Sequence, residues 1–150
     1  MRRAGAIAAL GVAMLLGGCS HLVVLHDPLS ASEHTDLGLA YERRGQPALA
    51  ASEYRRALRL DRRQVRARVN LGNLAAARGD WRSAEREYRR ALALQPGDAD
   101  ALNNLAWALL EQRRRLDEAE RCASLAVAAG GARDSVYRST LAEVRAARAR

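Results

Sequence analysis

The chain has 150 residues, a length that fits one domain of ordinary size. It carries 25 basic and 17 acidic residues, every basic one is Arg, and the formal net charge is +8. Because the Arg residues are interleaved with Glu and Asp and no aromatic-studded basic surface is visible, the composition argues against nucleic-acid binding.

The first eighteen residues are typical of a targeting segment. Arg2 and Arg3 form a positive start, residues 4–16 are apolar or Gly, and two Gly residues precede Cys19. A run this short is an h-region, since a spanning helix needs about 20 apolar residues. Small residues directly before a Cys resemble the lipobox of bacterial lipoproteins, which implies lipidation at Cys19. The alternative is an ordinary signal peptide with a chance Cys.

This resemblance also implies a location. Residues 1–18 are then the lipoprotein signal peptide and residues 19–30 a lipidated tether. Several acyl chains would anchor the protein in a membrane stably, where one chain is marginal. In Gram-negative lipoproteins an Asp after the Cys tends to retain the protein at the inner membrane, and Ser20 stands there instead. We therefore expect an outer-membrane lipoprotein of the bacterial envelope, facing the periplasm.

The rest of the chain repeats with a period of 34 residues. Leu37-Gly38 returns as Leu71-Gly72, and Gly45, Ala50, Tyr54 and Ala57 return as Gly79, Ala84, Tyr88 and Ala91. A fixed period in this range indicates a stacked repeat array. We expect helices over residues 32–44, 47–60, 65–78, 81–94, 99–111, 116–128 and 134–147, with a capping box of Ser30 and Glu33 before the first.

The repeated residue types explain how each unit folds. Gly45 and Gly79 end the first helix of a pair, because Gly adopts the left-handed conformation at little cost. Small residues such as Gly72 fall where two helices cross closely, and Tyr54 and Tyr88 fill the space between helices. One such unit cannot bury its apolar face alone, so neighbours must stack.

This pattern resembles the tetratricopeptide repeat (TPR), with its Leu-Gly, Tyr, Gly, Ala, aromatic and Ala at set offsets. The resemblance implies an all-α fold, an α-solenoid of about three TPR helical hairpins plus a C-terminal capping helix. The TPR domain would span residues 31–147, with repeats at about 31–64, 65–98 and 99–132 and the capping helix at 134–147. The third repeat departs from the pattern: one residue is inserted around Arg113 to Arg115, and Ala123 replaces the aromatic.

The TPR resemblance also implies a groove along the first helix of each pair, which holds an extended peptide or a partner helix. The groove offsets on which we place the candidate partner-binding site are Arg66, Asn70, Asn73, Asn103, Asn104 and Trp107. Further offsets fall on Ser32, Thr35, Asp36, Leu39, Val69 and Leu110. An Asn amide both donates and accepts and so can bind a peptide backbone, while Trp and Arg often dominate binding energy.

Two alternatives stay open for this groove. Asn at two of these offsets is common in the repeat's own consensus, so a structural role is the alternative to binding. Trp107 is equally compatible with packing against the last helix. The basic clamp for peptide carboxylates found in some family members is not reproduced, because only Arg66 is present.

No catalytic constellation is evident. His21, His26 and His34 lack the spacing of a helical metal pair, and Cys122 faces the core by helical phase. The acidic residues at 117–120 begin a helix, where negative charge suits the dipole. We therefore expect no metal, no cofactor and no enzymatic activity.

The expected function is that of a membrane-anchored scaffold or adaptor that binds a partner envelope protein in the groove. The sequence resembles the small TPR lipoproteins of pilus and secretion assembly and those that serve cell-wall enzymes. The alternative is a passive structural or self-associating envelope lipoprotein that rests on the membrane through its Arg-rich surface. Three repeats are near the minimum for a stable stack, so we also expect a homodimer joined through one end.

Overall fold

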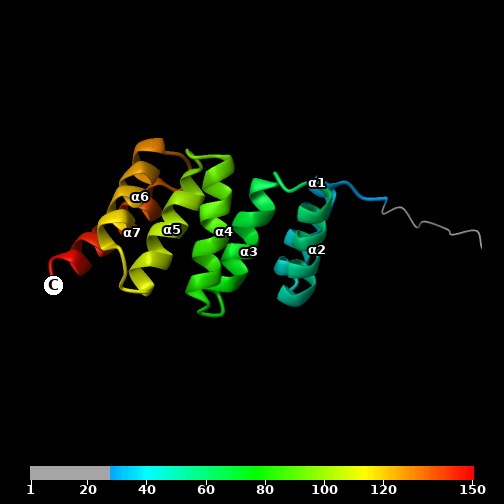
Figure 1. The fold of residues 1–150 in the computed structure, drawn as a ribbon, viewed down its shortest axis with the longest axis horizontal. Coiled ribbons are helices and arrows are strands. Elements are labelled where there is room, and N and C mark those ends of the chain that lie inside the picture. The colour runs from blue at the N-terminus through cyan, green and yellow to red at the C-terminus, as the bar shows by residue number, and fades with distance from the viewer. Residues whose placement is uncertain (1–27) are drawn as a thin grey trace, which may run out of the picture.

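The computed structural model describes residues 28–150, and this part of the chain consists of seven α-helices and no strands (Figure 1). The helices are α1 (Ala31–Arg43), α2 (Pro47–Leu60), α3 (Val65–Ala76), α4 (Trp81–Leu94), α5 (Ala99–Glu111), α6 (Leu116–Ala129) and α7 (Asp134–Arg148). They form three hairpins in a row, α1 with α2, α3 with α4 and α5 with α6, and α7 packs on the last one. The predicted all-α solenoid is confirmed, and each helix boundary lies within two residues of its predicted place. The predicted signal peptide, Cys19 and most of the tether lie outside the described residues.

Local signals set the starts and ends of these helices. Ser30 and Glu33 form the predicted capping box, in which each side chain accepts a hydrogen bond from the other's backbone N–H, at 3.2 and 2.7 Å. The Asp80 carboxylate caps α4 by accepting from the N–H of Ser83 at 3.1 Å. Gly45 and Gly79 have φ values of +69° and +73°, and so close the first two hairpins as predicted.

The turn of the third hairpin is built differently. Arg113 stands one period after Gly79 and adopts φ +48°, and Arg115 has φ +49° just before α6. The inserted residue therefore places two residues other than Gly in the left-handed region. Each costs roughly 1–2 kcal/mol relative to a right-handed conformation, because Cβ crowds the backbone there.

Glycine and tyrosine pair across the first two hairpins. A Cβ added at Gly38 would overlap the ring of Tyr54, and one added at Gly72 would overlap the ring of Tyr88. Both rings are buried, with exposed fractions of 0 and 2%. Gly at these two positions is therefore what allows α1 to approach α2, and α3 to approach α4, over a tyrosine ring.

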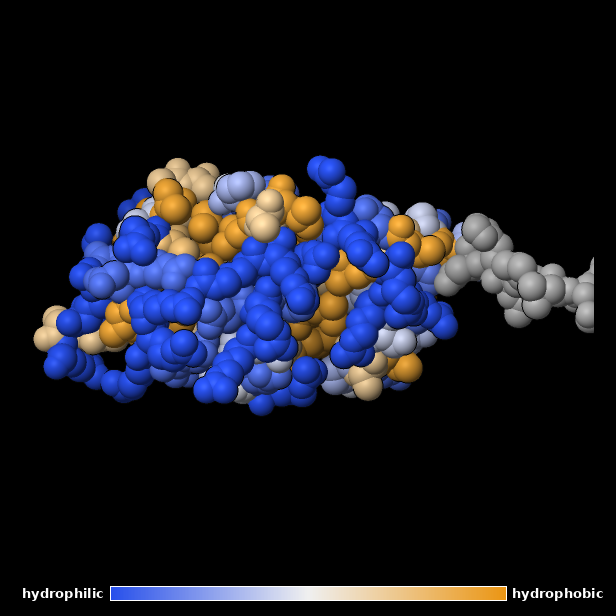
Figure 2. Space-filling view, in the orientation of Figure 1, coloured by the Kyte–Doolittle hydropathy of each residue, from blue (hydrophilic) through white to orange (hydrophobic). Residues whose placement is uncertain are grey.

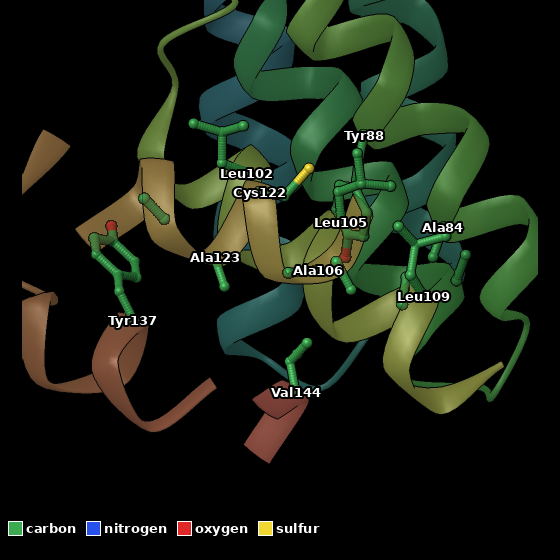
Figure 3. Packing of buried hydrophobic residues seen from close by; sticks show 14 residues of the cluster. Ala84, Tyr88, Leu102, Leu105, Ala106, Leu109, Cys122, Ala123, Tyr137 and Val144 are labelled. Carbon is green, nitrogen blue, oxygen red and sulfur yellow. The ribbon is translucent and has the colours of Figure 1, made fainter. Parts of the chain in front are cut away.

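The apolar core runs along the array as two clusters. The smaller one joins α1, α2 and α3 around Tyr54, and the larger one joins α3 to α7 around Tyr88, Leu109 and Val144 (Figure 3). Cys122 belongs to the larger cluster, as its helical phase predicts, and burial raises the pKa of its thiol. A buried thiol with a raised pKa serves as a small apolar core residue.

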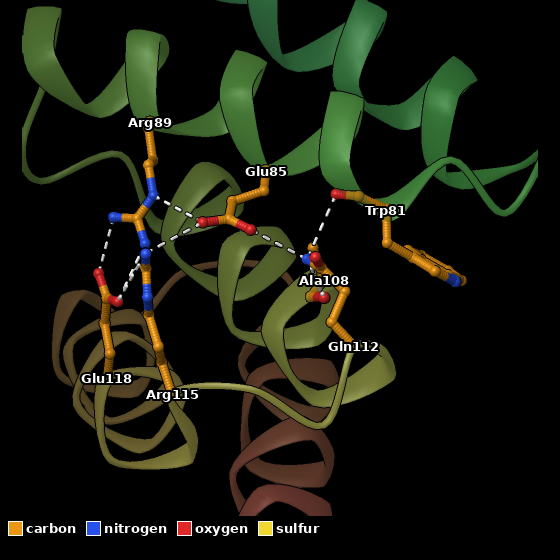
Figure 4. Close-up of polar contacts among 7 residues, drawn as sticks. All are labelled: Trp81, Glu85, Arg89, Ala108, Gln112, Arg115 and Glu118. Carbon is orange, nitrogen blue, oxygen red and sulfur yellow. Dashed lines mark hydrogen bonds and ion pairs between the residues drawn. The ribbon is translucent and has the colours of Figure 1, made fainter.

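Ion pairs fasten the second hairpin to the third (Figure 4). The Arg89 guanidinium donates to both oxygens of Glu118, at 2.7 and 2.9 Å, and to Glu85 at 3.0 Å. Arg115 approaches the same two carboxylates, and the Gln112 amide donates to Glu85 at 3.0 Å. The hydrogen bonds from Arg89 hold the pKa of Glu118 below its usual value. Several Arg residues of this basic chain are therefore used within the fold.

Candidate functional site

Four of the six predicted partner-binding residues line one groove. Asn73 comes from α3, and Asn103, Asn104 and Trp107 come from α5; the volume of the groove is about 510 Å³. These side chains meet because the first helices of the second and third hairpins lie next to each other in the stack. The 34-residue period thus brings three amides and an indole from separate helices to one surface.

Residues of α4 and α7 complete the groove. Trp81 and Tyr88 come from α4, while α7 contributes Val136, Ser139, Thr140 and Glu143. The repeat offsets do not predict these residues, because the last helix is expected only to cover the open end of the stack. A signal was present: one period of 34 plus the inserted residue carries the offset of Asn104 to Ser139. The last helix therefore forms the groove wall that the first helix of a fourth repeat would supply.

Hydrogen bonds link the amides and one tyrosine into a chain. The Tyr88 hydroxyl donates to Asn73 Oδ1 at 2.9 Å, and Asn104 Nδ2 donates to the same oxygen at 2.9 Å. Asn103 Nδ2 in turn donates to Asn104 Oδ1 at 3.3 Å. Tyr88 is deeply buried, which raises the pKa of its hydroxyl, so the phenol stays protonated as a donor at neutral pH.

This chain of donors ends at one unused acceptor. Asn103 is 4% exposed, and its Oδ1 is buried with no hydrogen-bond partner among the described residues. A buried acceptor left without a donor costs about 1–3 kcal/mol. Asn103 therefore lines the groove with a buried acceptor for which the described residues supply no donor.

The other two predicted residues lie elsewhere. The Arg66 guanidinium pairs with the Asp36 carboxylate of α1 at 2.7 Å, and both side chains are more than half exposed. Asn70 lies beside the Tyr54 hydroxyl, whose pKa it lowers against the stronger effect of burial. Neither residue lines the groove of Asn73 and Trp107. The prediction that Thr35, a further groove offset, faces a partner is wrong. Thr35 is 1% exposed, and its hydroxyl donates to the Ala31 carbonyl oxygen.

The described residues that could act as metal ligands or catalytic groups make structural contacts instead. His34 is buried, and its Nδ1 lies 2.6 Å from Glu53 Oε2, a contact that links α1 to α2. Across residues 28–150, no three His, Cys, Asp or Glu side chains gather as they would around a metal ion. Of the seven helices in that range, none is both long and apolar enough to cross a membrane.

Comparison with known proteins addresses the fold. A family model described as "Tetratricopeptide repeat" matches residues 35–81 and 69–135, which together cover more than half of the chain. Among solved structures, the chain is similar to one described as "First TPR of Spaghetti (RPAP3) bound to HSP90 peptide SRMEEVD". The TM-score is 0.75 at 17% sequence identity, and the match covers 85% of this chain and 99% of that one. No curated protein matches the sequence.

Proposed function

The chain belongs to the tetratricopeptide repeat family, and on this premise we propose that its groove binds an extended segment of another protein. The observation that carries the proposal is the convergence of Asn73, Asn103, Asn104 and Trp107 on one groove with an acceptor still to be satisfied. An amide surface suits a peptide backbone, which presents donors and acceptors alternately. The solved structure to which the chain is similar was itself determined with a bound peptide, which is consistent with this use of the fold.

Binding is favoured over catalysis by the kinds of side chain that gather in the groove. Amides, hydroxyls and indoles outnumber titratable groups there, and its one carboxylate, Glu143, meets the Ser139 hydroxyl only at the limit of hydrogen-bond distance, 3.5 Å. No His, Cys or basic side chain of residues 28–150 lines the groove beside them. General acid–base chemistry needs a positioned titratable group within hydrogen-bond reach of another reacting group. We therefore propose that the protein is a scaffold or adaptor and not an enzyme.

We further propose that the scaffold is anchored in the bacterial envelope through lipid on Cys19. The support is the resemblance of residues 1–19 to a lipoprotein signal and lipobox. Local concentration at a membrane would then raise the effective concentration of a partner in the same envelope. A Cys19→Ser variant is expected to lose labelling by a palmitate analogue and to leave the outer-membrane fraction. Unchanged labelling and fractionation would contradict the anchor.

The groove is tested by crosslinking in cells with the full-length protein. The site variant combines Asn73→Ala with Trp107→Ala, and the matched control combines Ser52→Ala with Leu94→Ala on exposed positions of α2 and α4. The expected result is one envelope protein captured by the parent and the control and lost from the site variant. If all three capture the same proteins in the same amounts, the groove is not the binding surface.

The alternative function, passive association with the membrane surface, predicts a different behaviour. The purified chain would then bind anionic liposomes strongly through its Arg-rich surface, and added salt would release it by screening. Dimerisation through one end of the array stays a separate prediction, which sedimentation equilibrium checks. Liposome binding that persists unchanged in high salt would argue against association through the Arg-rich surface.

A further inference from the structure

We infer that the segment bound in the groove carries a basic side chain, an Arg or Lys, that enters between the amide chain and α7. This inference rests on the proposed function and adds the chemistry of the occupant. Three observations about the groove lead to it: the charge of its lining, the polarity of its hydrogen-bond chain and its two indoles.

The charge of the lining favours a cation. Glu143 is the charged residue among those that line the groove, and it is exposed. Its recorded polar contact is with the Ser139 hydroxyl at 3.5 Å, and within residues 28–150 no basic side chain pairs with it. The groove therefore carries negative charge although the whole chain is positively charged, so it would attract a cation and repel a carboxylate.

Two basic side chains on or next to the helices of the groove, one on α3 and one just before α7, are already paired within the fold. Arg66 is paired with Asp36 at 2.7 Å, and Arg133 is paired with Asp100 at 2.8 Å. Both are on exposed positions and neither lines the groove. Recognition of a carboxylate requires donors such as a guanidinium or an ammonium directed at it. No residue of 28–150 that lines the groove carries a guanidinium or an ammonium, so an acidic segment is disfavoured.

The hydrogen-bond chain favours an occupant that supplies a hydrogen-bond donor. None of the three bonds in the hydrogen-bond chain is donated to Asn103. Asn103 Nδ2 donates to Asn104, Asn104 donates to Asn73, and the Tyr88 hydroxyl also donates to Asn73. The chain therefore leaves Asn103 Oδ1 buried and without a partner, as an acceptor that an entering N–H would satisfy once the side chains over it move aside. An Arg or Lys side chain supplies N–H donors and has no acceptor of its own.

Two indoles suit the same occupant. Trp81 and Trp107 both line the groove and are both partly exposed. A cation over the face of Trp is stabilised by the ring quadrupole, and a guanidinium also stacks on such a face. An acceptor, a carboxylate and indole faces in one groove therefore match the donors, the charge and the plane of an Arg side chain together.

The test compares three labelled peptides that differ at one position. Their sequences are GSAGARAGSAG, GSAGAQAGSAG and GSAGAEAGSAG, and their binding to the full-length protein in detergent is followed by fluorescence anisotropy. We expect the Arg peptide to bind about tenfold more tightly than the Gln peptide, and the Glu peptide to bind most weakly. Equal affinities, or tightest binding of the Glu peptide, would overturn the inference.

Two variants assign the preference to the named groups. Glu143→Gln should weaken the Arg peptide about threefold to tenfold and leave the Gln peptide unchanged, because only the charge is removed. Asn103→Asp keeps Oδ1 and adds a charge, so it should tighten the Arg peptide. Asp117→Asn, which removes an exposed carboxylate outside the groove, is the matched control and should change neither affinity.

The outcomes separate this inference from the proposed function. If none of the three peptides binds, the basic-segment inference is overturned, and the crosslinking experiment with the Asn73 and Trp107 variant still decides whether the groove binds a protein. If the Glu143→Gln variant retains the full Arg preference while its circular dichroism melt matches the parent, Glu143 does not recognise the cation. Tighter Arg binding that is lost in this variant supports the inference.

Discussion

Replacing Gly72 by Ala should destabilise the protein, although the same change ordinarily stabilises a helix. Gly is about 1 kcal/mol less favourable than Ala in a helix interior, so propensity alone predicts a gain. At this position the added Cβ would overlap the ring of Tyr88. That ring is 2% exposed, and its hydroxyl is tied to Asn73, so it cannot move aside freely. Overpacking of this kind costs about 1–3 kcal/mol.

The difference between this cost and the propensity gain is a net loss of roughly 0–2 kcal/mol. Its midpoint, about 1 kcal/mol, corresponds to a fall in Tm of roughly 4 °C for a domain of this size. Urea unfolding followed by circular dichroism measures it. Gly97→Ala is the matched control, because nothing lies within 4 Å of a Cβ built there, and its change should stay within about 0.5 kcal/mol.

A double variant tests the cause. If the loss comes from the ring, Gly72→Ala combined with Tyr88→Leu should be less destabilised than the sum of the two single changes, with an interaction energy of about 1 kcal/mol. A stabilised Gly72→Ala protein, or strictly additive changes, would refute the close approach of α3 and α4 over this ring.

Two further predictions concern the third hairpin. Arg113→Gly should stabilise the protein by about 0.5–1 kcal/mol in urea unfolding, because Gly relieves the cost of the left-handed backbone at φ +48°. Only part of this gain is lost to the greater freedom of Gly in the unfolded chain. A loss of stability would mean that the Arg113 side chain matters more than its backbone. Glu118→Gln should cost about 1 kcal/mol at pH 7, discounted for the partial exposure of its bond to Arg89. Because the folded-state pKa of Glu118 is lowered, its contribution is fully present above the ordinary Glu value of 4.5 and is lost as the pH falls through the lower folded-state pKa. The parent and the variant should therefore converge in stability in acid, and a difference that persists at pH 2 would show that the ion pair is not its source.

The fold could be predicted from the sequence because its signals are local and repeated. Gly45 and Gly79 mark turns that need a left-handed residue, and Ser30 and Asp80 cap the helices that follow. The 34-residue period then fixes how the hairpins stack. Tyr54 and Tyr88 are predicted as fillers for the same reason, since each recurs opposite a Gly.

The site was harder to predict because it depends on partners that periodicity does not specify. Asn73, Asn103, Asn104 and Trp107 share a groove, as the repeat offsets imply. Arg66 is also one of the predicted groove positions, yet Asp36 lies within reach on α1 and pairs with it. Which side chain captures an Arg is decided by the contacts between repeats, and these differ from one interface to the next.

The contribution of α7 was missed for a related reason. This helix lacks the repeat motif, so its composition suggests only a cover for the open end. Once it packs on α5 and α6, however, Ser139 and Glu143 face the groove and Tyr137 donates to Asp100 at 2.9 Å. A capping helix thus becomes part of the candidate binding surface, and it brings the carboxylate on which the inferred specificity depends.

The central claim is that the groove between α3, α5 and α7 holds a segment of a partner protein. Its most direct test is a photo-crosslinking amino acid incorporated in living cells, either at Ser139 in the groove or at Ser52, which is exposed on α2 outside it. We expect a defined crosslinked protein from position 139 and none from position 52, with the adduct lost when Asn73→Ala is added. The same adduct from both positions, or an adduct from position 52 alone, would contradict it.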